Sequence, residues 1–219
     1  MWRSSEINGL QVRAAAAWQS YDRIAEPYER LWAPRFERAA RHLLALIPLT
    51  PGARLLDVGT GTGWLAIALA RTFPQASITG IDIFEPAMRL ARHNVTTEAL
   101  SDRVSIVGQD ITTMDAADQF DAVWLPLPFL PKAIVPTAIA SAAKSLRPGG
   151  WLLPGTFAGP PDQLGRILTD LRIRRSGGHP WTPDDITTMM TDAGLTEARH
   201  VPRTWPAPLE LLAAQHPVG

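Results

Sequence analysis

The stretch LLDVGTGTGWL, residues 55–65, decides the fold of this 219-residue chain. An apolar run with one acid, Asp57, leads into three glycines at alternate positions, Gly59, Gly61 and Gly63, and then into a helical pattern. A tight turn between a strand and a helix exposes backbone N–H groups, and glycines let a ligand approach that backbone closely. The stretch therefore predicts a nucleotide-like ligand; a turn made sharp by its glycines alone is the competing interpretation.

Short apolar runs alternate with helical patterns outward from this turn. The expected strands are residues 53–58, 77–82, 104–109, 120–125 and 151–157, and the helical stretches between them are 64–72, 85–95, about 113–117 and 133–146. Strands joined by crossover helices predict an α/β fold with a parallel, doubly wound sheet. Helices at about 162–172 and 183–193 then precede strands in TEARHVPR and LELLAAQH, which predict an antiparallel C-terminal edge and seven strands in all.

Aromatic residues recur at helical spacing before the sheet. We expect residues 1–49 to form a helical cap and residues 50–219 to form the ligand-binding domain. The aromatic side chains of this cap would cover a cationic ligand and its reaction partner. The alternative is that they only pack the cap helix against the core. The residues of this expected lid are Trp18, Tyr21, Tyr28 and Trp32.

Composition limits the partners that we expect. Basic and acidic residues number 21 each, and a phosphate-binding surface usually needs an excess of positive charge, so no nucleic-acid partner is expected. The chain has no cysteine, which excludes disulfides and thiolate metal ligands. No run reaches the ~18 apolar residues of a membrane span, and the first residues lack the roughly 7–15 of a signal peptide. The expectation is a cytoplasmic protein with a small-molecule substrate and no membrane partner.

The glycine turn also fits a dinucleotide pattern. The run GTGWLA, residues 61–66, matches G-x-G-x-x-A, and Asp82, 19 residues after Gly63, suits ribose hydroxyls with either ligand. A short-chain dehydrogenase needs Tyr-x-x-x-Lys in its second half, but the only tyrosines are Tyr21 and Tyr28. An NAD(P)-dependent oxidoreductase remains a less favoured alternative.

The segments LLDVGTGTGWLAIALA, ITGIDIFEPAMRLARHNV, RVSIVGQDI, FDAVWLPLPFLP and SLRPGGWLL occur in the order and spacing of the class I S-adenosylmethionine-dependent methyltransferases. This resemblance covers roughly residues 50–157, and YDRIAEPYERLW resembles the helical cap of members that act on small molecules. It implies a Rossmann-like fold, S-adenosyl-L-methionine as cofactor and S-adenosyl-L-homocysteine as product.

The resemblance implies a cofactor bound by three acids. Asp57 matches the acid near the methionyl ammonium group, Asp82 the acid that accepts hydrogen bonds from both ribose hydroxyls, and Asp110 the acid that accepts from the adenine amino group. A helix N-cap is the alternative role for Asp82, and a solvent-facing loop position is the alternative for Asp110. The other implied cofactor residues are Ile83, Phe84 and Ile111 against adenine, together with Gly59, Thr60, Gly61, Gly63 and Tyr21.

The loop after the fourth strand reads LPLPFLP, residues 125–131. It departs from the Asn/Asp-Pro-Pro-Tyr/Phe loop of methyltransferases that act on nucleobases or glutamine amides, and no carboxylate cluster follows it to bind Mg²⁺. We therefore expect no metal and a hydrophobic or aromatic small acceptor, typical of secondary metabolism, although a loop packed for structure alone is the alternative. The expected acceptor contacts are Tyr28, Trp124, Pro126, Phe129 and Trp181.

A sulfonium already activates its methyl group, so positioning supplies much of the rate enhancement. A hydroxyl acceptor would still benefit from a base, and O-methylation is slightly favoured over N- or C-methylation. Of the five histidines, His179 lies in a Gly/Pro-bearing loop beside Trp181 and is the candidate base, with Tyr21 as a second catalytic candidate. A solvated loop histidine is the competing interpretation. A cyclisation or rearrangement in the same pocket also stays open.

Overall fold

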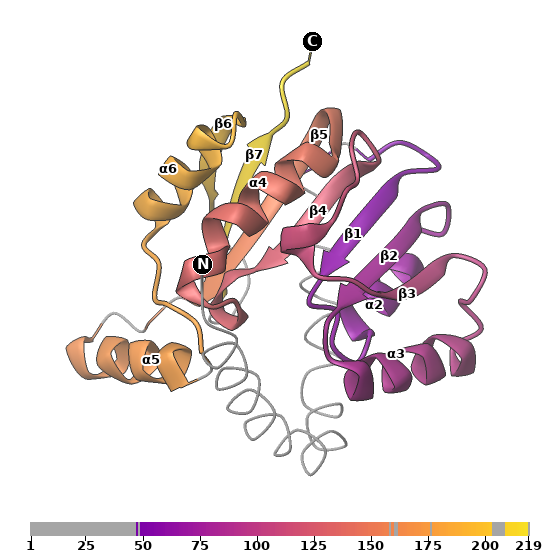
Figure 1. Ribbon diagram of the computed structural model, residues 1–219, viewed down its shortest axis with the longest axis horizontal. Helices are drawn as coiled ribbons and strands as arrows, with labels where there is room; N and C mark the ends of the chain where they lie inside the picture. Colours follow the sequence, from indigo (N-terminus) through magenta and orange to yellow (C-terminus); the bar gives the residue numbers. More distant parts are fainter. Residues whose placement is uncertain are drawn as a thin grey trace, which may run out of the picture.

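The computed structural model describes residues 47, 49–157, 159, 162–175, 177–202 and 209–218. Within these ranges seven strands form one sheet in the order β3-β2-β1-β4-β5-β7-β6 (Figure 1). The predicted cap, with Trp18, Tyr21, Tyr28 and Trp32, lies outside the described residues, so the functions expected of these side chains stay predictions.

The strands are β1 Arg54–Val58, β2 Ser77–Asp82, β3 Val104–Gly108, β4 Phe120–Pro126, β5 Leu146–Phe157, β6 Thr196–Val201 and β7 Leu209–Gln215. The α-helices are α2 Trp64–Thr72, α3 Glu85–Thr97, α4 Val135–Ser145, α5 Gln163–Arg175 and α6 Pro183–Asp192. Short 3₁₀ turns are η1 Ile111–Thr113, η2 Leu127–Phe129 and η3 Lys132–Ile134.

The sheet is parallel from β3 to β5, whereas β7 runs antiparallel to both β5 and β6. This arrangement confirms the predicted mixed, mainly parallel sheet of seven strands. Strand order reverses at β1, which has β2 on one side and β4 on the other. Ligands of open α/β sheets bind outside the carboxyl ends of the strands at such a switch point. The glycine turn follows β1, and therefore lies at that position.

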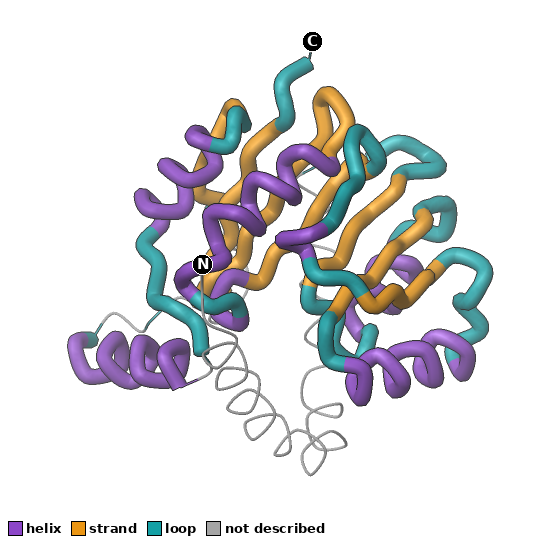
Figure 2. The backbone as a smooth tube through the Cα atoms, in the orientation of Figure 1, coloured by secondary structure: helices purple, strands orange, loops and turns teal. Residues whose placement is uncertain are grey.

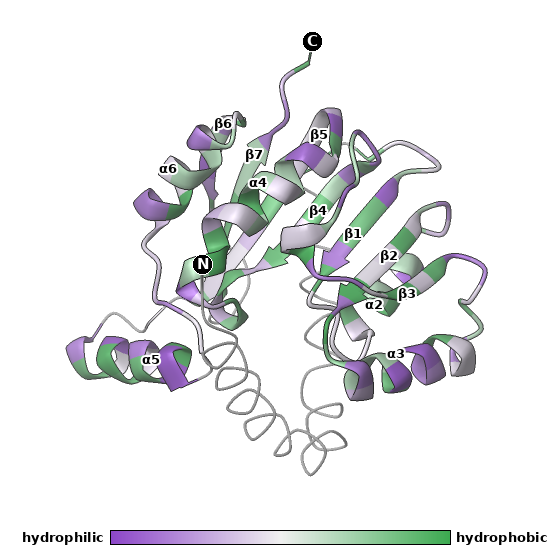
Figure 3. Ribbon diagram, in the orientation of Figure 1, coloured by the Kyte–Doolittle hydropathy of each residue, from purple (hydrophilic) through white to green (hydrophobic). Residues whose placement is uncertain are grey.

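Helices cover both faces of the sheet (Figure 2). Neighbouring residues of a strand point to opposite faces, so Leu55 packs in the cluster that contains Leu65 of α2, whereas Leu56 packs with Ile139 of α4. Helix α6 adds Met190 to the α4 side. The central strands carry the apolar residues that pack against the helices on both faces of the sheet (Figure 3). Among the described residues, no helix has the length and apolar content of a membrane span.

Two predicted boundaries were wrong. The helix expected at about 113–117 is only the turn η1, because Asp110 caps that turn through the Thr112 backbone N–H and the backbone is extended again at Met114. Strand β5 starts at Leu146 rather than at residue 151, with a register shift opposite β4. Gly150 permits this: a Cβ there would lie 2.9 Å from the Arg147 carbonyl oxygen.

Candidate functional site

The glycine turn has a backbone that only glycine adopts without strain. Gly59, Gly61 and Gly63 have φ values of 65°, 55° and 84°. A Cβ on Gly63 would also lie 3.1 Å from the Ala91 Cβ, so α3 packs closely against the turn. A Cβ on Gly61 would meet no atom closer than 3.9 Å. The turn conformation thus explains the glycines, and it also leaves free space beside Gly61 for a ligand.

Asp57 is the buried acid of the site. It is 1% exposed and accepts a hydrogen bond, 2.7 Å long, from Thr60 Oγ1. Burial raises the pKa of Asp57 to about 7; the Thr60 hydroxyl opposes this rise, and the negative charge of Asp82 adds to it. A cationic group beside Asp57 would favour its ionised form. The predicted position near an ammonium group therefore suits this carboxyl.

Gly80 of β2 is a supporting residue that the sequence analysis missed. A Cβ at this position would lie 2.7 Å from Thr60 Oγ1 and 2.9 Å from Ile106 Cδ1. A side chain at position 80 would therefore occupy the space in which the Thr60 hydroxyl lies when it donates to Asp57. A glycine inside a strand is a known signal of such close approach, and SITGID contains it.

Asp82 joins the end of β2 to the glycine turn. Its Oδ2 accepts from the Gly61 N–H at 2.9 Å, and its Oδ1 accepts from the N–H groups of Ile83 and Phe84 at 2.8 and 2.9 Å. The N-cap of α3 is Phe84, with no side-chain cap, so the N-cap alternative for Asp82 does not apply. Three N–H donors fix the carboxylate in one orientation at the position predicted to bind ribose hydroxyls.

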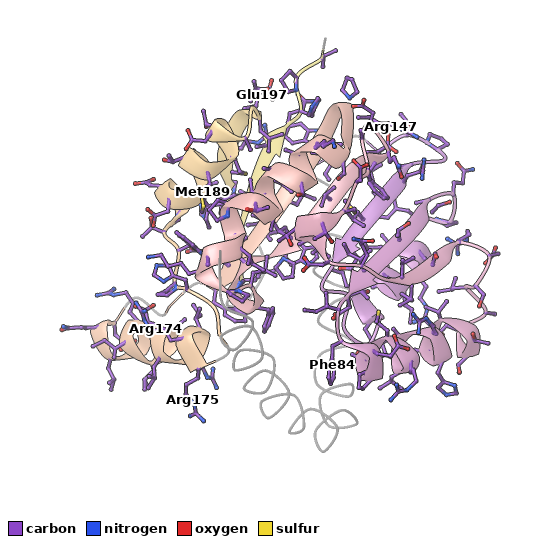
Figure 4. All side chains as sticks on the ribbon, in the orientation of Figure 1. Phe84, Arg147, Arg174, Arg175, Met189 and Glu197 are labelled. Carbon is purple, nitrogen blue, oxygen red and sulfur yellow. The ribbon has the colours of Figure 1, made fainter. Side chains whose placement is uncertain are left out.

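The predicted adenine contacts lie next to Asp82. Ile83 is 75% exposed, and Phe84 is half-buried at the carboxyl end of the sheet, where Figure 4 labels it. An exposed apolar side chain beside a fixed carboxylate suits a flat ring. Ile111 is buried in the α4-side core, and Asp110 accepts from the Thr112 N–H and hydroxyl, each at 2.8 Å. Asp110 is thus a cap rather than a solvated loop residue. The contacts of Asp110 and Ile111 with adenine stay predictions.

The end of β4, at Pro126, lies beside the glycine turn. A Cβ on Gly59 would lie 3.4 Å from Pro126 Cγ. Leu127 and Pro128 are buried, whereas Phe129 is 46% exposed and packs edge-on against Phe157 with ring centres 6.0 Å apart. The predicted apolar loop thus adjoins the predicted cofactor turn and exposes an aromatic ring.

Trp124 has a packing role that the sequence analysis did not anticipate. Its ring lies over Gly155 of β5, where a Cβ would be 2.2 Å from a ring carbon. It packs against the core cluster that contains Leu65 and Leu69 of α2. This packing explains Trp124 without an acceptor, and its predicted contact with the acceptor is not needed to account for it.

The loop after α5 brings His179 toward the β4 loop. A Cβ on Gly178 would lie 2.0 Å from the Pro128 carbonyl oxygen, so the two backbones are in direct contact. The His179 ring packs edge-on against Trp181, with ring centres 4.6 Å apart, and Trp181 Nε1 is buried without a hydrogen-bond partner in the described part of the chain. The structure thus places the loop that carries His179 and Trp181 beside the apolar loop of residues 125–131.

Charged groups of both signs lie near His179, namely Lys132, Arg174, Asp185 and Asp170. Partial burial lowers the pKa of its imidazole, the two cations lower it further, and the two carboxylates raise it. The Lys132 ammonium lies 5.8 Å from the centre of the Trp181 ring. On balance the pKa of His179 is lowered, which favours the neutral form that accepts a proton. The described residues contain no group of three or more potential metal ligands.

A family model described as a methyltransferase domain matches residues 55–150. A release factor glutamine methyltransferase from Gloeobacter violaceus is 31% identical over 197 residues, covering 77% of this chain and 69% of that protein. The 27-O-demethylrifamycin SV methyltransferase of Amycolatopsis mediterranei is 30% identical, over 73% of this chain and 64% of that protein. The match to another curated relative, a release factor glutamine methyltransferase from Rhodopirellula baltica, covers 43% of that protein's length.

A solved structure of an O-methyltransferase family protein from Burkholderia thailandensis shares the fold. Its TM-score is 0.74 at 21% identity, over 95% of this chain and 63% of that one. The strand order found here, with an antiparallel β7 between β5 and β6, departs from the 3-2-1-4-5-6 order of the dinucleotide-binding fold. The glycine turn, the two acids beside it and these similarities agree: the chain belongs to the class I S-adenosylmethionine-dependent methyltransferase family.

Proposed function

We propose that the protein transfers a methyl group from S-adenosylmethionine to a small, apolar or aromatic acceptor, with oxygen favoured as the accepting atom. One observation carries the proposal: Pro126, the last residue of β4 and part of the apolar segment 125–131, lies beside Gly59 of the glycine turn. An acceptor held by this segment would lie beside the cofactor. Methyl transfer requires this proximity above all.

The residues of the turn fit the cofactor. Asp57 is a buried carboxyl with a single side-chain hydrogen bond, and a bound ammonium group would stabilise its charge. Asp82 is a carboxylate already oriented by three backbone N–H groups, with lone pairs left to accept from hydroxyls. When bound, the cofactor supplies a methyl group activated by its sulfonium. Asp57 and Asp82 bind and orient it.

The β4 loop supports a small acceptor. Residues 125–131 contain no amide, carboxylate or hydroxyl side chain, and their backbone is fixed by three prolines. The loop offers no side chain to hold a planar amide, so the glutamine amide named for the Gloeobacter relative is disfavoured as the acceptor here. Phe129 and Phe157 instead offer an apolar edge on which an aromatic ring would pack. The rifamycin-related name of the Amycolatopsis relative agrees with a small-molecule acceptor and with transfer to oxygen.

His179 is the residue that we propose as the base. Partial burial, Lys132 and Arg174 lower the pKa of its imidazole and so favour the neutral form that accepts a proton. Its loop contacts Pro128 beside the proposed acceptor wall. The imidazole would accept the hydroxyl proton as the acceptor oxygen bonds to the methyl group, and the Lys132 ammonium would stabilise negative charge on that oxygen.

Calorimetric titration with S-adenosylmethionine, S-adenosylhomocysteine and NADH tests the cofactor. We expect micromolar binding of the first two and none of NADH; tight binding of NADH alone would contradict the proposal. An acceptor screen read by mass spectrometry then tests the chemistry. Methylation adds one CH₂ to the acceptor mass and consumes the cofactor, whereas a cyclisation leaves the mass unchanged and the cofactor intact.

A further inference from the structure

Helix α5 exposes an apolar stripe that the methyl-transfer site does not use. Leu164, Ile167, Leu168 and Leu171 recur at the spacing of one helical face, and their side chains are 52% to 66% exposed. Ile173, the residue of α5 that is buried, falls on the opposite side of the helix. Within the described part of the chain, the stripe therefore lies on the side of α5 opposite the buried Ile173. Figure 1 shows α5 at the periphery, beyond the layers that cover the sheet.

Arginines border this stripe. Arg175 follows Leu171 by four residues and so continues the stripe, while Arg174 lies seven residues after Ile167 and borders that side. Arg172, four residues after Leu168, borders the other side. Within the part of the chain that the structure describes, no ion pair involves Arg174 or Arg175. Figure 3 shows hydrophobic and hydrophilic residues around the same helix, and Figure 4 labels both arginines on it.

This pattern distinguishes between possible partners. Asp170 is the only acid within α5, against four arginines, so a second copy of the helix would bring like charges together. A planar anionic surface meets the apolar residues of the stripe and the exposed Arg174 and Arg175 at the end of the helix at the same time. Leucine and isoleucine side chains then enter the hydrocarbon, and the long arginine side chains keep their charges among the headgroups.

We propose that α5 is an interfacial helix that docks the protein on an anionic lipid surface. Such a helix lies along the membrane and does not span it, so the lack of a long apolar segment in the sequence does not bear on it. The expectation of no membrane partner rested on that lack. The binding requires neither the cofactor nor a particular acceptor, so it stands independently of the proposed function.

Vesicle co-sedimentation of the full chain tests the proposal. Pure phosphatidylcholine vesicles are compared with vesicles that also contain phosphatidylglycerol. We expect binding to the second kind, weakened by added salt. Arg174→Gln and Arg175→Gln should each reduce vesicle affinity about fivefold, the scale of one arginine at an anionic surface. Leu168→Gln should also reduce it, because a polar side chain then replaces an apolar one in the stripe.

Matched controls come from the same chain. Arg89→Gln removes an exposed arginine of α3, and Val218→Gln changes an exposed apolar residue near the C-terminus; neither should alter vesicle binding. Unchanged S-adenosylmethionine titration in every variant shows that the fold is retained. The proposal is overturned if the protein does not bind the phosphatidylglycerol vesicles, if it binds both kinds equally, or if the control variants lose as much binding as those of α5. It is also overturned if Leu168→Gln converts a dimer into a monomer in sedimentation velocity, since the stripe would then be a contact between copies.

Discussion

The Asp82 carboxylate and the Gly61 backbone N–H, 21 residues apart in sequence, are joined by a 2.9 Å hydrogen bond. This bond ties the end of β2 to the glycine turn after β1. The two parts of the proposed cofactor site are therefore positioned by each other, and a change at either position alters both. The predictions below use this coupling.

Asp82→Ala should weaken S-adenosylmethionine binding by about 1.5–3 kcal/mol, the range of hydrogen bonds to a charged group. The variant loses the proposed acceptor of the ribose hydroxyls and also leaves the Gly61 N–H without its partner. Calorimetric titration measures the loss, with Asp192→Ala, an exposed acid at the end of α6, as the control. Equal affinity of the two variants would remove Asp82 from the site.

Cofactor affinity should depend on pH through Asp57. Its pKa of about 7 in the free protein means that it is largely protonated below that value. An ammonium group favours the charged carboxylate, so affinity should rise as pH increases toward 7 and level off above it, with protons released on binding at lower pH. Titration in buffers of different ionisation enthalpy measures this release. Asp57→Asn, which can still accept from Thr60, should bind weakly at every pH and release no proton from this position.

The same carboxyl should affect stability in the opposite direction. Folding raises the pKa of Asp57 from 3.8 to about 7, so the folded state holds more protons than the unfolded state between these values. Without cofactor, the contribution of Asp57 to the free energy of unfolding is fully present at low pH and is lost as pH rises through 7. Asp57→Asn should remove this loss and melt at a higher temperature than the wild type above pH 7. An equal or lower melting temperature of the variant there would contradict the assignment.

His179→Ala should reduce turnover about 10²- to 10⁴-fold if the imidazole is the base. In the wild type, activity should fall on the acid side at a pKa below 6.5, because burial and the two neighbouring cations lower that of His179. Lys132→Met removes one of these cations and should move that limb toward higher pH. His93→Ala, on the outer side of α3, is the matched control. A rate within a few-fold of wild type for the His179 variant would exclude the role.

Gly80→Ala should destabilise the protein by about 1–3 kcal/mol, because the new methyl group would contact Thr60 and Ile106 at less than normal distance. It should also weaken cofactor binding, since Thr60 would move away from Asp57. Gly108→Ala, at the end of β3, is the control: its methyl group would meet the Met88 side chain at an ordinary 3.4 Å. Thermal melts and cofactor titrations should show a larger loss of stability and affinity for Gly80→Ala than for Gly108→Ala. Equal losses would mean that the site does not need the close approach of Thr60 to Gly80.

The sheet and the glycine turn could be predicted because their signals are local. The apolar runs and the three alternating glycines lie within a few residues of one another, and Asp82 follows its own strand directly. The helix at about 113–117 could not be excluded in this way, because its absence depends on how Asp110 caps a shorter turn. The surroundings of His179 could not be predicted either. Lys132 is distant in sequence, and contacts such as those of Gly178 with Pro128 and of Lys132 with Trp181 bring the two segments together.

Trp124 shows the limit of interpreting aromatic residues from sequence. Its position near the end of the fourth apolar run predicts an acceptor contact, which stays a prediction; the structure shows its ring filling the space over Gly155. A sequence pattern identifies the strand that a residue occupies. Whether a half-buried side chain packs on the sheet depends on the residues of the neighbouring strand.

The place of β7 in the sheet also affects the order in which the chain can fold. This strand comes last in sequence but pairs on both sides, with β5 and with β6. During synthesis β6 emerges before the strand that connects it to the sheet, and β5 keeps an open edge until residues 209–215 have left the ribosome. Completion of the sheet must therefore follow translation of β7. A chain cut before Leu209 would expose two unpaired edges rather than lose one peripheral strand.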